Sequence, residues 1–290
     1  MPPTFASKVP TSLPLLARGG QADIFGCGED RVIRVGRRPQ DMERLRYEYK
    51  VYSLLGGTAV PVPRVFELST MEGRTAIVME RLPGPSMMDE LRARPFSARA
   101  RAGELAELHS TVLATEVPPG LTDVKDKARH CVRRAEALDA GTRDYIVGIV
   151  AGLPDGRSLC HGDFHPGNIM RRNGESCIID WSAASVGDMH ADIAHTYILL
   201  RVVPRVPQQG RLQHAVARWI GRRMADAYLR AITRLVNVDP AILSLWTLVN
   251  AAERLYHGLA SEQKELLHFV ASTVDALRKN RGERVFYTRL

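Results

Sequence analysis

Apolar residues recur at three- and four-residue spacing through most of the chain after residue 97, a pattern typical of amphipathic helices. In the stretch 98–113, for example, Leu105, Leu108 and Val112 fall on one face. Asp239-Pro240 reads as a helix start, because Asp caps and Pro suits the first turn. The expected helices cover 98–113, 125–138, 142–153, 208–236, 240–257 and 261–280, with another starting at Gly187-Asp188.

The first eighty residues follow a different pattern. Short apolar runs separated by turn residues predict strands at 21–25, 31–35 and 75–80, with a further strand leading into Gly19-Gly20. One helix is expected at 41–55. Residues 1–14, rich in Pro, Ser and Thr, predict a loose leader. A strand-rich beginning followed by helices indicates an α+β fold.

The richest stretch runs from Leu159 to Trp181 and reads LCHGDFHPGNIMRRNGESCIIDW. Pro166-Gly167 excludes a helix at its centre. Ile169-Met170 and Cys177 to Ile179 predict two strands joined by a tight turn with Asn173-Gly174 at its tip. Such a hairpin would return Asp180 to the loop that holds Asp163 and Asn168.

Oxygen ligands of this kind suit Mg²⁺, which takes one or two carboxylates and completes its shell with water and phosphates. The spacing His161-x-Asp163-x₄-Asn168 also matches the kinase catalytic loop, in which the Asp accepts the proton of the substrate hydroxyl and the Asn binds metal. Asn168 and Asp180 are therefore the expected metal ligands. His161, at the loop entrance, is expected to support the loop around the catalytic Asp163.

The motif HGDFHPGN followed by IIDW resembles the aminoglycoside phosphotransferase and choline kinase group of small-molecule kinases. The resemblance implies a bilobal fold like that of protein kinases and transfer of a phosphoryl group from ATP or GTP with Mg²⁺. It places a nucleotide-binding lobe at residues 1–83, a hinge near 79–83 and a catalytic and acceptor-binding lobe at 84–290. In the hinge, the backbone of Glu80, Arg81 and Leu82 would bond to adenine.

Kinases hold the donor phosphates with a Lys on the third strand. This chain has Arg34 at the matching position, in RVIR, and arginine keeps the charge and can bind phosphate in a bidentate way. Glu48 on the following helix is the expected partner of Arg34, with Glu43 as a competitor. The turn at Gly19-Gly20 could place backbone N–H groups over a phosphate.

The phosphate acceptor is expected to be a small molecule, since DWS at 180–182 leads almost directly into a helix and leaves no activation loop for a peptide. The resemblance suggests an aminoglycoside or another antibiotic, or a choline-like amine, sugar or amino alcohol. Asp188, Glu253 and Glu262 could line a pocket for a polycation, although the second lobe is basic. The resemblance also implies that Asp192 buttresses the catalytic loop, and His109 is expected to be structural.

Two other functions fit parts of the sequence. His161, Asp163 and His165 could bind zinc or iron in a metal-dependent hydrolase. An inactive kinase fold could instead serve as a scaffold or bind nucleic acid, because the net charge is +8. The basic residues are spread along the chain without a basic run, so nucleic-acid binding is not favoured. The intact set of Asp163, Asn168 and Asp180 favours the kinase.

The remaining composition fits a cytoplasmic protein. The N-terminus does not resemble a signal peptide, and no stretch approaches the about 18 apolar residues of a membrane helix. The four cysteines are scattered, without a C-x-x-C pair, which argues against a zinc ribbon or a disulfide framework. The sequence leaves the oligomeric state open.

Overall fold

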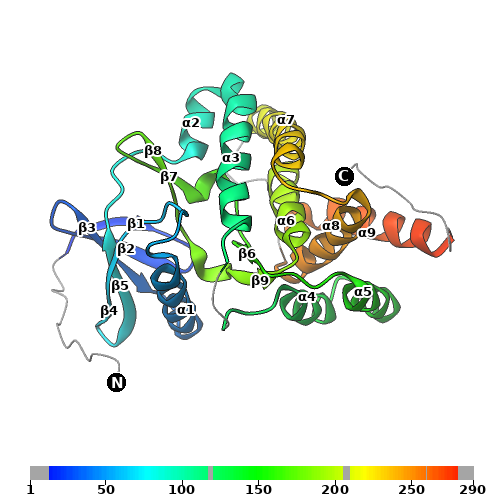
Figure 1. The fold of residues 1–290 in the computed structure, drawn as a ribbon, viewed down its shortest axis with the longest axis horizontal. Helices are drawn as coiled ribbons and strands as arrows, with labels where there is room; N and C mark the ends of the chain where they lie inside the picture. Colours follow the sequence, from blue (N-terminus) through cyan, green and yellow to red (C-terminus); the bar gives the residue numbers. More distant parts are fainter. Residues whose placement is uncertain (1–12, 117–119, 205–209, 259, 280–290) are drawn as a thin grey trace. The chain divides into compact units, whose positions relative to one another are not determined.

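The computed structural model describes residues 13–116, 120–204, 210–258 and 260–279. The chain forms two compact units (Figure 1). The first comprises residues 1–89 and 167–184, and the second comprises 90–166 and 185–290. Residues 167–184 thus belong with the strand-rich unit, whereas the sequence prediction placed every residue after 83 in the second lobe.

The strand-rich unit is built on a five-stranded antiparallel sheet with the order β1-β2-β3-β5-β4. Its strands are β1 (Leu15–Arg18), β2 (Ala22–Cys27), β3 (Arg31–Gly36), β4 (Val65–Met71) and β5 (Arg74–Glu80). Helix α1 (Pro39–Leu55) packs against β3, β4 and β5. The buried side chains of Ile33, Val35, Met71 and Ala76 form the core of the sheet. The strands and the helix expected from the sequence are therefore present.

A second hairpin in this unit has the predicted turn. Strands β7 (Ile169–Arg172) and β8 (Glu175–Ile178) pair antiparallel. The two turn residues Asn173 and Gly174 have φ angles of 53° and 89°. Positive φ at both central positions is the requirement of a type I′ turn, which Asn-Gly meets best. The Ile178 N–H donates to the Pro61 carbonyl at 2.7 Å, which attaches the hairpin to the connector before β4.

The second unit is mostly helical, and α3 lies alongside α7 (Figure 1). Helix α2 (Met87–Ala93), which the sequence analysis did not predict, and the turn at Pro166–Asn168 carry the chain between the units. A short pair, β6 (Ser158–Cys160) with β9 (Ser185–Gly187), lies within the unit. The other helices are α3 (Ala98–Leu113), α4 (Val124–Arg133), α5 (Ala140–Gly152), α6 (Met189–Arg201), α7 (Arg211–Leu235), α8 (Pro240–Tyr256) and α9 (Ala260–Lys279). The α+β prediction is confirmed.

Most predicted helix bounds agree with the structure to within a few residues. The main difference is α4, which ends at Arg133 rather than at 138. Ala135 and Leu138 continue the apolar pattern and are buried, but they lie in a turn that ends at Asp139, the N-cap of α5. Apolar spacing therefore continued past the helix end. Of the predicted helix 208–236, residues 208 and 209 lie outside the described residues, as do residues 1–12 of the predicted leader.

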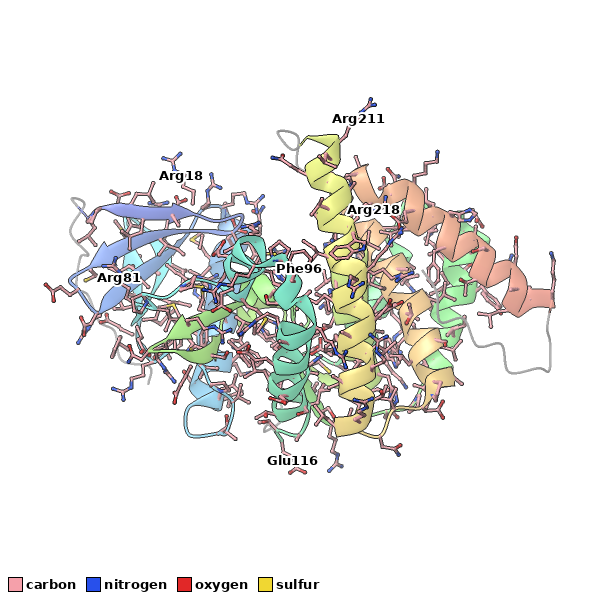
Figure 2. All side chains as sticks on the ribbon, turned by 90° about the horizontal axis from the view of Figure 1, so that it is seen from above. Arg18, Arg81, Phe96, Glu116, Arg211 and Arg218 are labelled. Atoms are coloured by element: carbon pink, nitrogen blue, oxygen red, sulfur yellow. The ribbon has the colours of Figure 1, made fainter. Side chains whose placement is uncertain are left out.

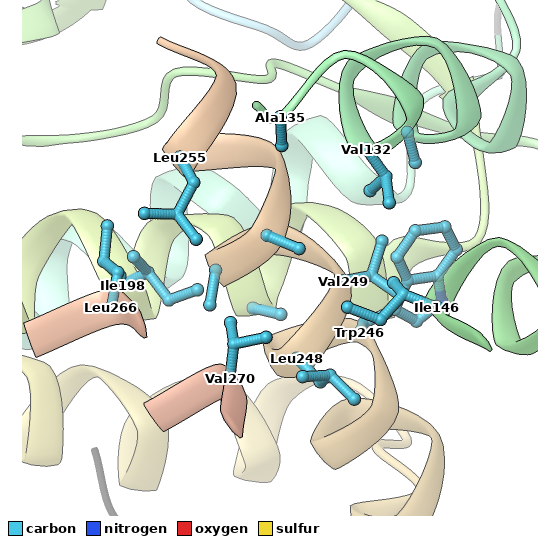
Figure 3. Close-up of a cluster of buried hydrophobic side chains, with 14 of the residues drawn as sticks. Val132, Ala135, Ile146, Ile198, Trp246, Leu248, Val249, Leu255, Leu266 and Val270 are labelled. Atoms are coloured by element: carbon cyan, nitrogen blue, oxygen red, sulfur yellow. The ribbon is translucent and has the colours of Figure 1, made fainter. Parts of the chain in front are cut away.

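The core of the helical unit joins α4, α5, α6, α8 and α9 (Figure 3). Trp246 of α8 is fully buried there, whereas Trp219 of α7 is 46% exposed. No helix among the described residues is long and apolar enough to span a membrane.

Asp188 connects two helices of this core. Its side chain caps α6 by accepting from the His190 N–H, as predicted, and its Oδ2 accepts from Trp246 Nε1 at 2.7 Å. Burial opposes ionisation, but the hydrogen bonds from His190 and Trp246 lower the pKa of Asp188. Asp188 is therefore an internal structural carboxylate, and its predicted place in an acceptor pocket is wrong.

We expect Asp188→Ala to lower the free energy of unfolding by about 3 kcal/mol, because it leaves buried donors on Trp246 and His190 without an acceptor. Asp126→Ala is the matched control: Asp126 is an exposed residue of α4 whose pair with Arg129 should contribute less than about 1 kcal/mol. Urea unfolding followed by circular dichroism measures both. Equal losses in the two variants would contradict this role of Asp188.

Candidate active site

Arg34 is a largely buried cation in the middle of the sheet of the strand-rich unit. It lies in β3 between Ile24 of β2 and Ile77 of β5. Its Nη1 donates to Glu48 Oε1 at 2.8 Å, and its Nη2 lies 3.8 Å from Asp180 Oδ1. Burial disfavours the charged form, but the carboxylates of Glu48 and Asp180 outweigh it and raise the pKa of Arg34. Arg34 thus remains a cation in a buried position.

The structure separates the two candidate partners of Arg34. Glu48 is fully buried on α1, and burial raises the pKa of its carboxyl to about 7 even though the charge of Arg34 opposes that shift. Glu43, on the same helix, instead pairs with Arg46 at the surface. The two glutamates are five positions apart, so they point in different directions on the helix. The pairing of Arg34 with Glu48 is as the sequence predicted.

Asp180 follows β8 and has a left-handed backbone conformation, with φ of 63°. This region is uncommon for a residue other than glycine, although Asp tolerates it better than most. Two groups hold it there: its N–H donates to the Tyr52 hydroxyl at 3.1 Å, and its Oδ1 accepts from Ser182 Oγ at 2.8 Å. Tyr52 and Ser182 were not recognised in the sequence, although Tyr52 lies one helical turn after Glu48 on the same face.

Asn168 lies beside Asp180 within the same unit. The Ile179 N–H donates to the Asn168 carbonyl at 2.9 Å, which closes the hairpin immediately after the pairing of Ile169 with Ile178. Asn168 and Asp180 therefore lie next to each other at the open end of the hairpin, and Asp180 Oδ1 is 3.8 Å from Arg34 Nη2. Because one carboxylate and neutral oxygen donors are what Mg²⁺ takes from proteins that bind it with phosphates, this donor set fits the ion.

The predicted glycine turn joins β1 to β2. The Gly19 N–H donates to the Ala22 carbonyl at 2.9 Å, so it is already engaged. A Cβ at Gly19 would lie 2.9 Å from that oxygen, which explains the glycine, whereas a Cβ at Gly20 would meet nothing within 4 Å. Gly19 is thus the closed position of the turn, with its N–H engaged and no room for a side chain, and Gly20 is the open position, with free space around it.

The predicted hinge residues differ in their backbone bonds. The Glu80 N–H donates to the Arg64 carbonyl and the Arg81 N–H to the Asp30 carbonyl, each at 2.8 Å. The N–H of Arg81 is thus engaged within the unit, and its side chain is exposed (Figure 2). Leu82 N–H makes no bond to another described residue.

Asp163 lies in the helical unit and has a 40% exposed side chain. Its Oδ2 lies 3.7 Å from His165 Nε2. Partial burial opposes ionisation, but His165, followed by His195 and His161, lowers the pKa of Asp163 below its ordinary range. Asp163 is therefore an ionised, partly accessible carboxylate at neutral pH.

The loop before Asp163 is held by one buried carboxylate. Asp192 of α6 accepts from the backbone N–H groups of His161 and Gly162 at 2.6 and 2.8 Å. Gly162 has φ of 75°, a conformation that favours glycine. His161 is buried, and its Nδ1 accepts from the Asp163 N–H at 3.2 Å. The geometry matches the expected buttress and makes His161 a support for the backbone of Asp163.

Asp192 is itself fixed by a chain of buried polar groups. His109 Nε2 lies 3.0 Å from Asp192 Oδ2, and His109 Nδ1 lies 2.6 Å from the Tyr228 hydroxyl. Burial opposes ionisation of Asp192, but the bond from His109 and the neighbouring charges lower its pKa. His109 is thus structural, as predicted. Tyr228 was missed, because it comes from α7 and only the pairing of α7 with α3 brings it to His109.

The same loop argues against the hydrolase alternative. The imidazole of His161 faces the protein interior, and its Nδ1 is used by the backbone of Asp163. Among the described residues, the ligand atoms of His161, Asp163 and His165 do not all come within 4.8 Å of one another. This geometry does not suit a zinc or iron centre.

The sequence also matches a known protein family. The profile of the phosphotransferase enzyme family matches residues 23–234, more than half of the chain. The chain belongs to this family. Among curated proteins, hygromycin-B 4-O-kinase of Escherichia coli is 25% identical over a match that covers 69% of this chain and 66% of that protein. The match therefore spans just under two thirds of that relative.

Solved structures of family members share the fold. A thermostable mutant of aminoglycoside phosphotransferase APH(4)-Ia, in a ternary complex with AMP-PNP and hygromycin B, has a TM-score of 0.64 at 19% identity and covers 94% of this chain and 95% of its own. A type VIII aminoglycoside-3'-phosphotransferase has a TM-score of 0.58 at 19% identity, covering 87% and 92%. The kinase-like fold expected from the sequence motif is confirmed.

Glu48→Gln should destabilise the strand-rich unit by about 3–5 kcal/mol, because it leaves the buried cation of Arg34 without its main counter-charge. Glu43→Gln, on the surface of the same helix, should change stability by less than about 0.5 kcal/mol. Urea unfolding of both variants provides the measurement. A loss of less than about 1 kcal/mol in Glu48→Gln would contradict the role of Glu48 as the main counter-charge of the buried Arg34.

The pH dependence of stability tests Asp192. Its folded-state pKa is lowered, so its contribution is present at neutral pH and is lost as the pH falls below its ordinary value toward the lowered one. Asp192→Asn should therefore cost roughly 2–4 kcal/mol near neutral pH and progressively less below about pH 4. The measurement is the free energy of unfolding of the original protein and of Asp192→Asn between about pH 3 and pH 7. A difference that stays constant down to about pH 3 would exclude an ionised Asp192 as the cause.

Proposed function

We propose that this protein transfers the γ-phosphoryl group of ATP or GTP to a hydroxyl group of a small molecule, with Mg²⁺ as cofactor. The observation that carries the proposal is the position of Asp180, which the hairpin returns to Asn168 and which lies 3.8 Å from the buried cation of Arg34. A carboxamide, a carboxylate and a guanidinium next to one another suit a metal–polyphosphate ligand. Membership of the phosphotransferase enzyme family supports the same reading.

Asn168 and Asp180 are the residues that would hold the magnesium ion. A magnesium ion held there would supply positive charge against the charge that develops on the donor phosphates. Tyr52 and Ser182 fix the backbone and the side chain of Asp180, so the carboxylate is oriented before the ligand arrives. This orientation reduces the cost of ordering the site on binding.

Arg34 anchors the donor phosphates, and Glu48 positions it. Arg34 Nη1 is taken by Glu48, while Nε has no hydrogen-bond partner among the described residues. Gly20, at the open position of the β1–β2 turn, can present its N–H to a phosphate, with Gly19 setting the turn. For the adenine base, we assign hydrogen bonds to the Glu80 carbonyl and the Leu82 N–H, because the Arg81 N–H already donates to the Asp30 carbonyl.

Asp163 is the proposed catalytic residue. It orients the acceptor hydroxyl and takes its proton as the oxygen attacks the γ-phosphorus. A lowered pKa keeps Asp163 ionised at neutral pH, so it is ready to accept a hydrogen bond from the hydroxyl. Asp192 and His161 hold the loop, and we assign them positioning roles.

The acceptor we favour is a hydroxyl-rich, cationic compound of the aminoglycoside class, and the hygromycin-B kinase among the relatives supports this choice. Of the three carboxylates suggested for its pocket, Asp188 and Glu262 are internal: Glu262 is buried and paired with Arg254. Glu253 is also buried, with Lys127 Nζ 3.7 Å from its Oε1. The acceptor pocket must therefore use carboxylates beyond the predicted set. We place the reaction in the cytoplasm, where the nucleotide and Mg²⁺ are available, and assign no role to nucleic acid.

A panel of acceptors tests the class directly. Purified protein is supplied with Mg²⁺ and ATP or GTP, and nucleoside diphosphate release is measured with hygromycin B, a 2-deoxystreptamine aminoglycoside, choline and simple sugars. We expect release with an aminoglycoside and detection of its phosphate ester by mass spectrometry. Turnover of only choline or a sugar would support the proposed phosphotransferase activity but would refute an antibiotic as the acceptor.

Asp163→Asn should lower turnover by roughly 10²- to 10⁴-fold, the usual contribution of a positioned base, while nucleotide affinity changes little. Asp126→Asn, in the exposed surface of α4, is the control and should keep full turnover. The measurement is a coupled assay of diphosphate release, with nucleotide binding followed by calorimetry. Unchanged turnover in Asp163→Asn would remove Asp163 from the mechanism.

A further inference from the structure

Three side chains of metal-binding residue types converge in the helical unit. Cys131 lies on α4, Glu253 on α8, and His257 at the C-cap of α8. The ligand atoms of all three lie within 4.8 Å of one another. We propose that Cys131, Glu253 and His257 form a binding site for a divalent ion of the zinc class.

Helix geometry explains why the two ligands of α8 share a direction. Glu253 and His257 are four residues apart, and residues at i and i+4 lie on one face of a helix. His257 has φ of −74° and ψ of −11°, so the backbone is still helical at this position. The same i, i+4 spacing is used for paired helical ligands in known zinc sites.

The third ligand comes from a helix that is packed firmly against α8. Val132 of α4 and Val249 and Leu255 of α8 belong to the same buried cluster (Figure 3). Cys131 precedes Val132 and is itself buried, so its thiol is fixed in place by core packing rather than by a flexible loop. An ion bound by the three residues would therefore join α4 to α8 without a rearrangement of the helices.

A second observation points to a ligand at this place. Glu253 is buried, with a side chain only 5% exposed, yet its Oε1 has no hydrogen-bond partner among the described residues. The nearest cation is Lys127 Nζ, one turn before Cys131 on α4, at 3.7 Å and beyond hydrogen-bond distance. A buried carboxylate oxygen without a hydrogen bond is unfavourable, and a metal ion would satisfy it.

The donor set selects the metal. Thiolate, imidazole and carboxylate are the three ligand types of zinc, whereas Mg²⁺ prefers oxygen alone. Binding replaces the thiol proton, which leaves to solvent as the sulfur–metal bond forms, so the site gains one positive charge in total. Lys127 Nζ lies 3.7 Å from Glu253 Oε1, so its positive charge limits the affinity of the site. His257 is exposed, which provides a route for the ion and room for water as the fourth ligand.

Cobalt(II) titration of the full-length protein tests the site, because a cobalt–thiolate bond gives a charge-transfer band in the near ultraviolet. The titration is run with excess Mg²⁺ to occupy oxygen-only sites. We expect the band to saturate at one ion per chain and to disappear on addition of zinc. Cys131→Ser should abolish it, whereas Cys27→Ser, which removes the partly exposed cysteine of β2, should not.

His257→Ala should weaken zinc binding by at least tenfold, since changes in residues that merely support metal ligands already cost about 10- to 100-fold. It removes an exposed side chain, so the fold should survive, and circular dichroism verifies this. The matched control is His268→Ala, an exposed histidine of α9, which should bind zinc like the original protein. A thiolate band that persists in Cys131→Ser, no band at one equivalent of cobalt, or equal zinc affinity in His257→Ala and His268→Ala would overturn the proposal.

Discussion

The structure of the strand-rich unit depends on one buried cation. Arg34 lies in the middle of the sheet, where a guanidinium without counter-charges would cost several kcal/mol. Glu48 from α1 and Asp180 from the end of the β7–β8 hairpin supply those counter-charges. The need to neutralise Arg34 therefore joins the sheet, its covering helix and the hairpin. The same contacts place Arg34 and Asp180 together, and these are the side chains that we propose to bind the magnesium–nucleotide ligand. Stability and the proposed chemistry rest on the same three side chains.

The helical unit uses a buried charge in a different way. Asp192 accepts hydrogen bonds from two consecutive backbone N–H groups and from His109, so its carboxylate fixes a loop and does not bind a ligand. Asp163 follows that loop directly and keeps part of its carboxylate exposed. A rigid, fully satisfied carboxylate thus supports the proposed catalytic carboxylate, which comes directly after the loop. This division of roles explains why the more deeply buried aspartate is not the one to which we assign the chemistry.

Local signals allowed much of this arrangement to be predicted from the sequence. Asn173-Gly174 demanded a tight turn, which determined that Asp180 returns to Asn168, and the helical position of Glu48 made it the partner of Arg34. Tertiary contacts decided the rest. The Arg81 N–H is engaged by the Asp30 carbonyl, and Asp188 and Glu262 are internal because Trp246 and Arg254 bind them. Tyr228 and the group of Cys131, Glu253 and His257 could not be foreseen, since each depends on two helices meeting.

The most direct test of the account is a thermal shift with ADP or AMP-PNP, with and without Mg²⁺, on the original protein, Asp180→Ala and Glu43→Ala. A ligand that binds only the folded state at a hundredfold excess over its Kd adds about 2.7 kcal/mol of stability. If Asn168 and Asp180 hold the ion at the phosphates, Mg²⁺ should enlarge the nucleotide-induced shift in the original protein and in Glu43→Ala but not in Asp180→Ala. A shift that is the same with and without Mg²⁺, or that survives intact in Asp180→Ala, would contradict the magnesium–nucleotide site.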